Sequence, residues 1–178
     1  MDEHIILEEQ AIAEERSLEL ARMGTAITTK AIGDLPTLKP PTCVAPTASI
    51  REAIEKMKSY RVGCVLVEEK RRLVGVFSER DVLNKVAGQA LDIDRVKVSE
   101  LMTADPECLT PDDGVAYALN KMNVGGFRHI PLVDESGKPV GVVAMRNIVD
   151  YIVQLFPEEV LNLPPSPLHT ISHAREGA

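Results

Sequence analysis

The sequence of 178 residues has no tryptophan, only 3% aromatic residues and three cysteines. With so few rings, the core must consist of Val, Ile, Leu, Ala and Met. At 44% apolar residues, the chain can bury one core or two small ones that support each other. Cys43, Cys64 and Cys108 lie in apolar stretches without CxxC spacing. This placement indicates reduced core thiols in a cytoplasmic protein and argues against a metal site.

Excess positive charge, long apolar runs and catalytic motifs are also absent. The net charge of −7 argues against a nucleic-acid partner, because binding phosphate backbones requires clustered Lys and Arg. No apolar run approaches the ~20 residues of a membrane helix, and the acidic start of the chain differs from a signal peptide. The motifs G-x-S-x-G and H-E-x-x-H and the Walker loop are missing. We therefore expect no nucleic-acid partner, no membrane contact and no enzyme activity.

What the sequence does contain is an internal repeat with a spacing of about 65 residues. The block Val74-Gly75-Val76 with Arg80 after it recurs as Val140-Gly141-Val142 with Arg146 after it. A repeat of this length predicts a small unit used twice, related by a pseudo-two-fold axis. Clefts between two such halves are places where a ligand binds.

Both copies have the pattern of a β-α-β-β-α unit. The first predicts strands at 42–45, 64–67 and 73–77 and helices from Ile50 and at about 79–87, and the second predicts strands at 107–110, 130–133 and 140–143 and helices from Val115 and at about 146–155. Thr47 and Asp112 or Asp113 are candidate N-caps after Pro46 and Pro111. The expected fold class is mixed α/β (α+β), with two pseudo-symmetric units packed together.

A further helix is predicted before the repeat, over residues 3–23, with Gly24 and the threonines after it ending the pattern. After Phe156 the chain becomes rich in proline, and we expect a mobile tail. The predicted organisation is a helix and linker at 1–30, a first domain at 31–95, a second domain at 96–156 and the tail at 157–178.

The first candidate for ligand binding is the strand-to-helix turn that contains Ser78 and Asp81. A hydroxyl, a carboxylate and free backbone N–H groups meet there, and helix N-termini favour anions. The carboxylate could accept both hydroxyls of a ribose. The alternative is structural, because Ser-x-x-Asp is also close to a capping box.

The second candidate is Arg128-His129, two cationic residues directly before a buried strand. Cations are costly there unless they face solvent or an anion, and phosphate suits the fork of an arginine. The alternative is an arginine paired with one of the many carboxylates nearby.

Together these features resemble a tandem pair of CBS domains, also called a Bateman module. The similarity covers roughly residues 32–156 and rests on Gly63-Cys-Val-Leu-Val67, Gly75-Val-Phe-Ser-Glu-Arg-Asp81, Met102-Thr-Ala-Asp-Pro106, Phe127-Arg-His-Ile-Pro-Leu-Val-Asp134 and Gly141-Val-Val-Ala-Met-Arg-Asn147. The resemblance implies two units packed sheet to sheet with two clefts. It also implies binding of an adenosine-containing ligand, with AMP, ADP or ATP ahead of S-adenosylmethionine and NAD.

The resemblance implies a set of ligand-binding residues. Ser78 and Asp81 would hold ribose and phosphate, the segment before the second copy would line the base, and Arg128 would reach phosphate. The expected set is Ser78, Arg80, Asp81, Ser99, Met102, Thr103, Arg128, His129 and Asn147. The second cleft departs from the pattern, because Ala144 and Asn147 replace the Ser and Asp, and Gly63 stands where Arg128 would.

The sequence thus predicts a cytoplasmic sensor that binds an adenine nucleotide and forms a homodimer through the apolar faces of the helices that start at Ile50 and Val115. Two alternatives stay open. One is a structural or interaction module whose clefts are empty. The other is a regulatory subunit that docks on an unidentified enzyme or transporter through its N-terminal helix.

Overall fold

The fold is described by a computed structural model for residue 14, residues 17, 18 and 21, and residues 24–155. The first unit contains a four-stranded sheet in the order β1-β2-β3-β4. Its strands are β1 (Cys43–Val44), β2 (Cys64–Glu69), β3 (Arg72–Ser78) and β4 (Thr103–Ala104). Its helices are α2 (Ile50–Tyr60), α3 (Glu79–Asp81), the π-helix η2 (Val82–Val86) and α4 (Val98–Leu101).

The second unit repeats this plan with a smaller sheet. It contains the 3-10 helix η1 (Ile32–Asp34), α5 (Val115–Gly125), β5 (His129–Val133), β6 (Pro139–Ala144) and α6 (Met145–Leu155). The counterparts of β1 and β4 are single bridges, Leu109 to Leu132 and Lys39 to Val142. The strand predicted at 107–110 is therefore wrong in extent, because only one residue pair forms. The mixed α+β fold class of two similar units is confirmed.

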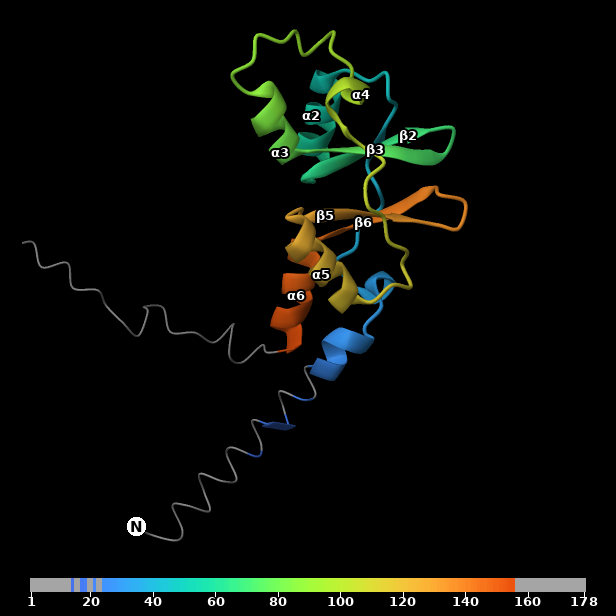
Figure 1. The fold of residues 1–178 in the computed structure, drawn as a ribbon, viewed down its shortest axis with the longest axis vertical. Coiled ribbons are helices and arrows are strands. Elements are labelled where there is room, and N and C mark those ends of the chain that lie inside the picture. The colour runs from blue at the N-terminus through green and yellow to red at the C-terminus, as the bar shows by residue number, and fades with distance from the viewer. Residues whose placement is uncertain (1–13, 15–16, 19–20, 22–23, 156–178) are drawn as a thin grey trace, which may run out of the picture.

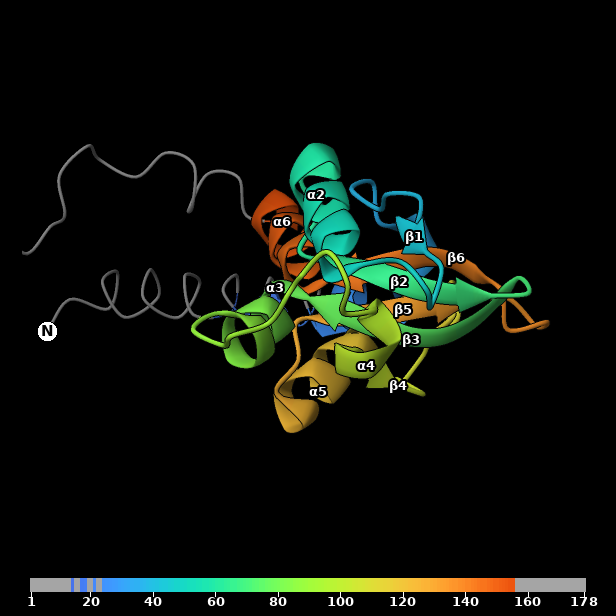
Figure 2. The same cartoon turned by 90° about the horizontal axis from the view of Figure 1, so that it is seen from above.

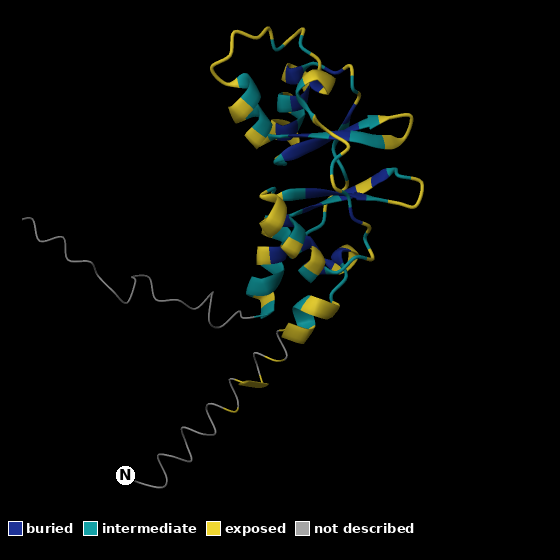
Figure 3. Cartoon of the chain, in the orientation of Figure 1, coloured by how far each residue is buried: buried dark blue, intermediate teal, exposed yellow. Residues whose placement is uncertain are grey.

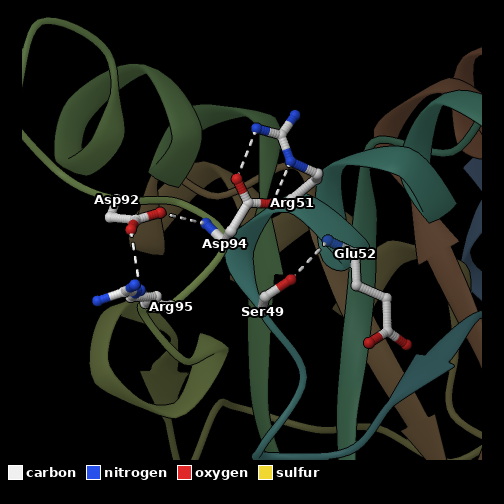
Figure 4. Close-up of polar contacts among 6 residues, drawn as sticks. All are labelled: Ser49, Arg51, Glu52, Asp92, Asp94 and Arg95. Atoms are coloured by element: carbon white, nitrogen blue, oxygen red, sulfur yellow. Dashed lines mark hydrogen bonds and ion pairs between the residues drawn. The ribbon is translucent and has the colours of Figure 1, made fainter.

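Both long central helices begin where the apolar periodicity predicted, but their caps differ. Pro46 and Pro111 occupy the second position of β-turns, closed by Ala48 N to Ala45 O at 3.0 Å and by Asp113 N to Thr110 O at 3.2 Å. The turns delay each helix start. Ser49 rather than Thr47 therefore caps α2, its Oγ accepting from Glu52 N at 3.1 Å (Figure 4).

The second helix has no side-chain cap, since Gly114 stands at its N-cap position. Asp113 instead accepts hydrogen bonds from Thr110 N (2.7 Å) and Thr110 Oγ1 (3.0 Å). The prediction of Asp112 or Asp113 as the cap is wrong, because the carboxylate of Asp113 is used within the turn. On α2, Arg51 holds the linker by two hydrogen bonds to Asp94, also drawn in Figure 4.

The two cores exchange chain segments. Ile32 and Leu35 are buried in the second core, beside Val115 and Ile148, although they lie within the predicted first domain. Ile93, Val96, Val98 and Leu101, which follow the first repeat, pack in the first core. The domain limits of 31–95 and 96–156 stay a prediction, and the packing crosses the limits at both ends.

The two sheets face each other, and the long helices cover their outer sides (Figures 1 and 2). The facing strands β2 and β5 contain fully buried runs, and Figure 3 shows this buried layer through the centre of the molecule. The hairpins of the two units are bonded directly, by Leu73 N to Gly137 O at 3.0 Å and Arg72 Nε to Ser136 O at 3.1 Å. This contact fixes one end of the interface between the sheets.

The segment before the repeat is helical in its described part, including residues 24–29. The prediction that Gly24 ends the helix is therefore wrong. The threonines that follow do not end the helix. Their hydroxyls donate to backbone carbonyls four residues earlier, from Thr28 to Gly24 at 2.7 Å and from Thr29 to Thr25 at 2.8 Å, and such bonds are compatible with a helix. Most of residues 3–23 and the whole tail at 157–178 lie outside the described residues. None of the helices in the described ranges has the length and hydropathy needed to cross a membrane.

Candidate ligand-binding cleft

A cavity of about 630 Å³ lies between the two units, on the side where β3 runs into α3. The first unit and the linker contribute Gly63, Val76, Ser78, Glu79, Arg80, Asp81, Leu83, Thr103, Asp105, Pro106 and Glu107, and the second unit contributes Phe127, Arg128, His129 and Pro131. Cavities that bind small molecules have volumes of about 300–1,000 Å³. The cavity is therefore large enough for a nucleotide-sized ligand.

The Ser78–Asp81 turn at the cavity is a capping box. Ser78 N and Ser78 Oγ both donate to Asp81 Oδ2, at 2.9 and 2.7 Å, and Asp81 N reaches back to Ser78 Oγ at 3.4 Å. The structural reading of this turn is thus correct. It does not exclude ligand binding, because both residues also line the cavity.

The second oxygen of Asp81 is held by Lys85, whose Nζ lies 2.8 Å from Oδ1. Burial by itself would raise the pKa of the Asp81 carboxyl, but the hydrogen bonds from Lys85 and Ser78 outweigh it, so the pKa lies below its usual value. A carboxylate has about four acceptor positions. Ser78 fills both positions on Oδ2 and Lys85 one on Oδ1, so one position is left for a ligand. The expectation that Asp81 accepts both ribose hydroxyls stays a prediction, and it requires Ser78 Oγ or Lys85 to release one position.

His129 lies in the wall of the cavity against Gly63 of the other unit. A Cβ at position 63 would lie 2.6 Å from both Cε1 and Nε2 of the ring, which is closer than side chains approach each other. Burial lowers the pKa of His129 and the charges of Arg128 and Arg80 lower it further, while Glu79 opposes them. The imidazole is therefore predominantly neutral at pH 7. Gly63 provides the space that the ring needs.

The two arginines at the cavity have different surroundings. Arg80 donates from its guanidinium to the carbonyl of Gly126, the left-handed residue that ends α5 in the second unit. Arg128 is exposed and lines the cavity two residues later. Arg80 thus bridges the mouth between the units, and Arg128 is the better placed cation for a bound anion.

The structure places three of the expected residues outside the lining, namely Met102, Ser99 and Asn147. Met102 packs in the first core, where its thioether fills the space left by Gly75. Ser99 is exposed on α4, with its backbone N–H bonded to Pro46 O at 3.2 Å. Only Thr103 of that segment reaches the cavity, because side chains alternate along an extended segment and Thr103 pairs with Val76, another lining residue.

Asn147 occupies the position in the second unit that Asp81 has in the first, and its polar groups are used internally. Its Oδ1 accepts from Ala144 N at 2.7 Å, and its Nδ2 donates to Thr37 O at 3.0 Å and Thr37 Oγ1 at 2.9 Å. Asn147 therefore ties the segment before β1 to the second unit. This geometry gives no support to a ligand-binding role.

Sequence reasoning missed the acidic residues of the cavity, Glu79, Asp105 and Glu107. Glu79 belongs to the turn itself, and Asp105 and Glu107 come two and four residues after Thr103. Their positions beside the predicted site residues could have identified them as lining residues. With Asp81, the lining carries four carboxylates, against the guanidinium groups of Arg80 and Arg128. The cavity is thus not simply an anion-binding site.

Comparison with known proteins agrees with the repeat. The family model of the CBS domain matches twice, at residues 32–88 and 98–154. An uncharacterised 17.7 kDa protein of Acidianus ambivalens is 34% identical over 106 residues, which cover 59% of this chain and 63% of the relative. An uncharacterised protein of Methanopyrus kandleri is 32% identical over 120 residues, covering 65% and 61%. The matches thus span less than two thirds of either relative.

Solved structures share the fold. A CBS domain protein from Pyrobaculum aerophilum, complexed with AMP, superposes with a TM-score of 0.62 at 30% identity. The superposition covers 70% of this chain and 99% of the other.

Proposed function

Since this chain belongs to the CBS-domain family, we propose that it is a regulatory module that binds an adenine nucleotide in the cleft lined by Ser78 and Asp81. One observation carries the proposal. A pre-ordered carboxylate of the first unit and the Arg128-His129 pair of the second unit line one cavity of about 630 Å³. A nucleotide has both matching groups, a ribose that donates hydrogen bonds and a phosphate that accepts them.

The hydrogen-bonding capacity of the turn sets how a ribose would bind. Asp81 Oδ1 offers one acceptor position, and Ser78 Oγ already donates to Asp81 and accepts weakly from Asp81 N. One ribose hydroxyl would donate to Asp81 and the other would share Ser78 Oγ. Ordering of the turn before binding lowers the entropy cost of association.

The charges of the cavity favour a ligand with few phosphates. Each added phosphate would bring negative charge near Glu79 and Asp105, and like charges in a partly desolvated site repel, whereas Glu107 is paired with Lys121. AMP is therefore the preferred nucleotide, ahead of ADP and ATP, and the solved relative from Pyrobaculum aerophilum was complexed with AMP. Mg²⁺ added with ATP would offset this penalty.

The test is a set of calorimetric titrations of the wild-type chain with AMP, ADP, ATP, ATP with Mg²⁺, S-adenosylmethionine and NAD. We expect one saturable site with AMP bound most tightly. In a separate thermal unfolding measurement, AMP at 100 times its Kd should stabilise the folded chain by about 2.7 kcal/mol. Absence of saturable binding for every compound would contradict the proposal. That result would favour the alternative of a module with empty clefts.

The partner proposals concern a second copy and a regulated protein. Apolar side chains remain exposed on the long helices, with exposed fractions of 63% for Tyr60, 50% for Tyr117 and 79% for Val124. Burial of such side chains against a second copy would favour a homodimer. The alternative is that the module docks on a separate enzyme or transporter through its N-terminal segment. A pull-down with and without residues 1–24 distinguishes the alternatives, because only the docking partner would be lost with that segment.

A further inference from the structure

Lys85 lies directly behind the ligand-binding turn without lining the cavity. Its Nζ makes two strong contacts, 2.8 Å to Asp81 Oδ1 and 2.7 Å to the carbonyl oxygen of Leu101. The Asp81 side chain is only 13% exposed and that of Lys85 38% exposed, so the pair is partly shielded from water. Such pairs are worth more than fully exposed ones.

The two contacts connect two neighbouring segments of the first unit that both reach the cavity. Asp81 belongs to the turn after β3, whereas Leu101 ends α4 and is two residues before Thr103, which lines the cavity. Lys85 lies in the π-helix η2, a rare backbone conformation in which Ala87 N donates to Val82 O at 2.8 Å. Single-turn π-helices occur frequently at functional sites.

We propose that Lys85 is a positioning residue that sets ligand affinity by fixing the Asp81 carboxylate and joining the turn to the segment before Thr103. The inference rests on the proposed function of this cleft. Lys85 fills one acceptor position on Asp81 Oδ1. By fixing the carboxylate, it also fixes the direction of the remaining acceptor position, which would receive the ligand. Lys85 also ties the turn after β3 to the end of α4, next to the backbone pairing of β3 with β4. Without it, the Asp81 carboxylate would lose the partner that orients Oδ1, and the Leu101 carbonyl would lose its donor.

The chain offers a matched control in Lys56 on α2. Lys56 also lies four residues after an acidic residue, 3.7 Å from Glu52, and it also donates to a backbone carbonyl, that of Cys43, at 3.0 Å. Its side chain is 37% exposed, close to the value for Lys85. Lys56 does not line the cavity and contacts no residue of the Ser78–Asp81 turn. Replacing either lysine removes the same kind of interactions, and only one replacement affects the turn.

The pH response gives a readout that a general loss of stability would not change. The charged and titratable groups around Asp81 are Lys85 in η2, Cys64 on β2, Glu79 and Arg80 in the turn, and Arg128 and His129 across the cleft. Burial and the charges of Glu79 and Asp81 raise the pKa of Cys64 to about 12, so this thiol stays neutral. Loss of Lys85 would raise the pKa of Asp81, because the group that most favours its ionised form would be gone.

The experiment compares Lys85→Met and Lys56→Met by AMP titration calorimetry at pH 7.5 and at a series of lower values, with the Asp81 carboxyl followed by NMR in the ligand-free protein. We expect Lys85→Met to weaken AMP binding about tenfold, as loss of a charge-assisted hydrogen bond does. In this variant binding should also be lost at a higher pH than in the wild type. Lys56→Met should stay within about twofold of the wild type. Lys85→Arg, which keeps the charge, should recover most of the affinity.

The outcomes separate the two proposals. Equal AMP affinity and equal acid sensitivity of the two methionine variants would overturn the role of Lys85 while leaving the nucleotide site in place. A wild-type chain that binds no AMP would overturn the function and with it this inference. If circular dichroism shows that Lys85→Met is unfolded, the same criteria apply to Lys85→Gln against Lys56→Gln, since glutamine keeps a donor for the Leu101 carbonyl.

Discussion

Asp81 and Asn147 occupy equivalent positions in the two repeats, but replacing each by alanine should affect different properties, ligand affinity for Asp81 and stability for Asn147. Asp81→Ala removes the one acceptor position that faces the nucleotide, so the main effect should be on ligand affinity. Asn147→Ala removes three hydrogen bonds that lie inside the second unit. Its main effect should be on stability.

The magnitudes follow from the bonds that each variant loses. A hydrogen bond to a charged group is worth about 1.5–3 kcal/mol, so Asp81→Ala should weaken AMP binding roughly tenfold to 150-fold. Its loss of the capping box should lower the free energy of unfolding by about 1 kcal/mol. Asn147→Ala leaves the half-buried Thr37 hydroxyl and carbonyl without their donor, which should lower that free energy by about 1–3 kcal/mol with AMP affinity nearly unchanged.

Calorimetric titration gives the affinities, and urea unfolding of the ligand-free proteins gives the stabilities. The wild type should show one site per chain. Two equivalent sites, or a larger loss of AMP affinity in Asn147→Ala than in Asp81→Ala, would refute the assignment of the ligand to the first cleft. A stable Asn147→Ala variant would instead refute the structural role of the bonds to Thr37.

Three further predictions concern the cleft wall and the surface. Because burial holds the pKa of His129 below its ordinary value of about 6.5, the unfolded chain binds the proton more readily. The neutral His129 ring therefore stabilises the folded state fully above about pH 6.5, and this stabilisation is lost as the pH falls below that value. AMP affinity should rise over the same fall, since phosphate favours the protonated ring, and both effects should vanish in melting curves and titrations of His129→Gln. Gly63→Ala should lower stability by about 1–3 kcal/mol in urea unfolding, because its methyl would meet His129, whereas Gly24→Ala, in open space on a helix, should raise it by up to about 1 kcal/mol. Light scattering should give the mass of a dimer, and charged residues at Tyr117 and Val124 should halve that mass; a wild-type monomer at tens of micromolar would contradict the dimer.

Local patterns predicted those parts of the fold that local chemistry determines. The apolar spacing identified Ile50 and Val115 as the first residues of α2 and α5, and the alternating and β-branched runs identified β2, β3, β5 and β6. Errors arose where a distant partner decides the outcome. Thr103–Ala104 becomes a strand only because β3 offers it a free edge, and Leu109 remains a single bridge to Leu132.

The candidate site divides in the same way. The motif identified Ser78 and Asp81, which lie together in one turn, and the pair Arg128-His129, all of which line the cavity. It could not distinguish Thr103 from Met102, because which of two neighbours faces the cleft depends on the register with β3. The spacing of Lys85 four residues after Asp81 indicates an ion pair on a helix, but not a link to another segment. The importance of this lysine depends on the carbonyl of Leu101, which the fold brings to it from another segment.

The turns at Asp81 and Asn147 keep the same backbone hydrogen bond in both repeats but use the remaining polar atoms differently. Both turns use the side chain three residues after the strand to accept a hydrogen bond from the last strand residue, Asp81 for Ser78 and Asn147 for Ala144. In the first copy the second carboxylate oxygen is partnered by Lys85 alone and keeps a free acceptor position. In the second copy the amide of Asn147 donates both hydrogens to Thr37. An amide so used has no donor left for a ligand, and the chain before β1 is fixed by the same bonds. The second copy thereby stabilises the fold through the position that the first copy would use, in our proposal, to bind a nucleotide.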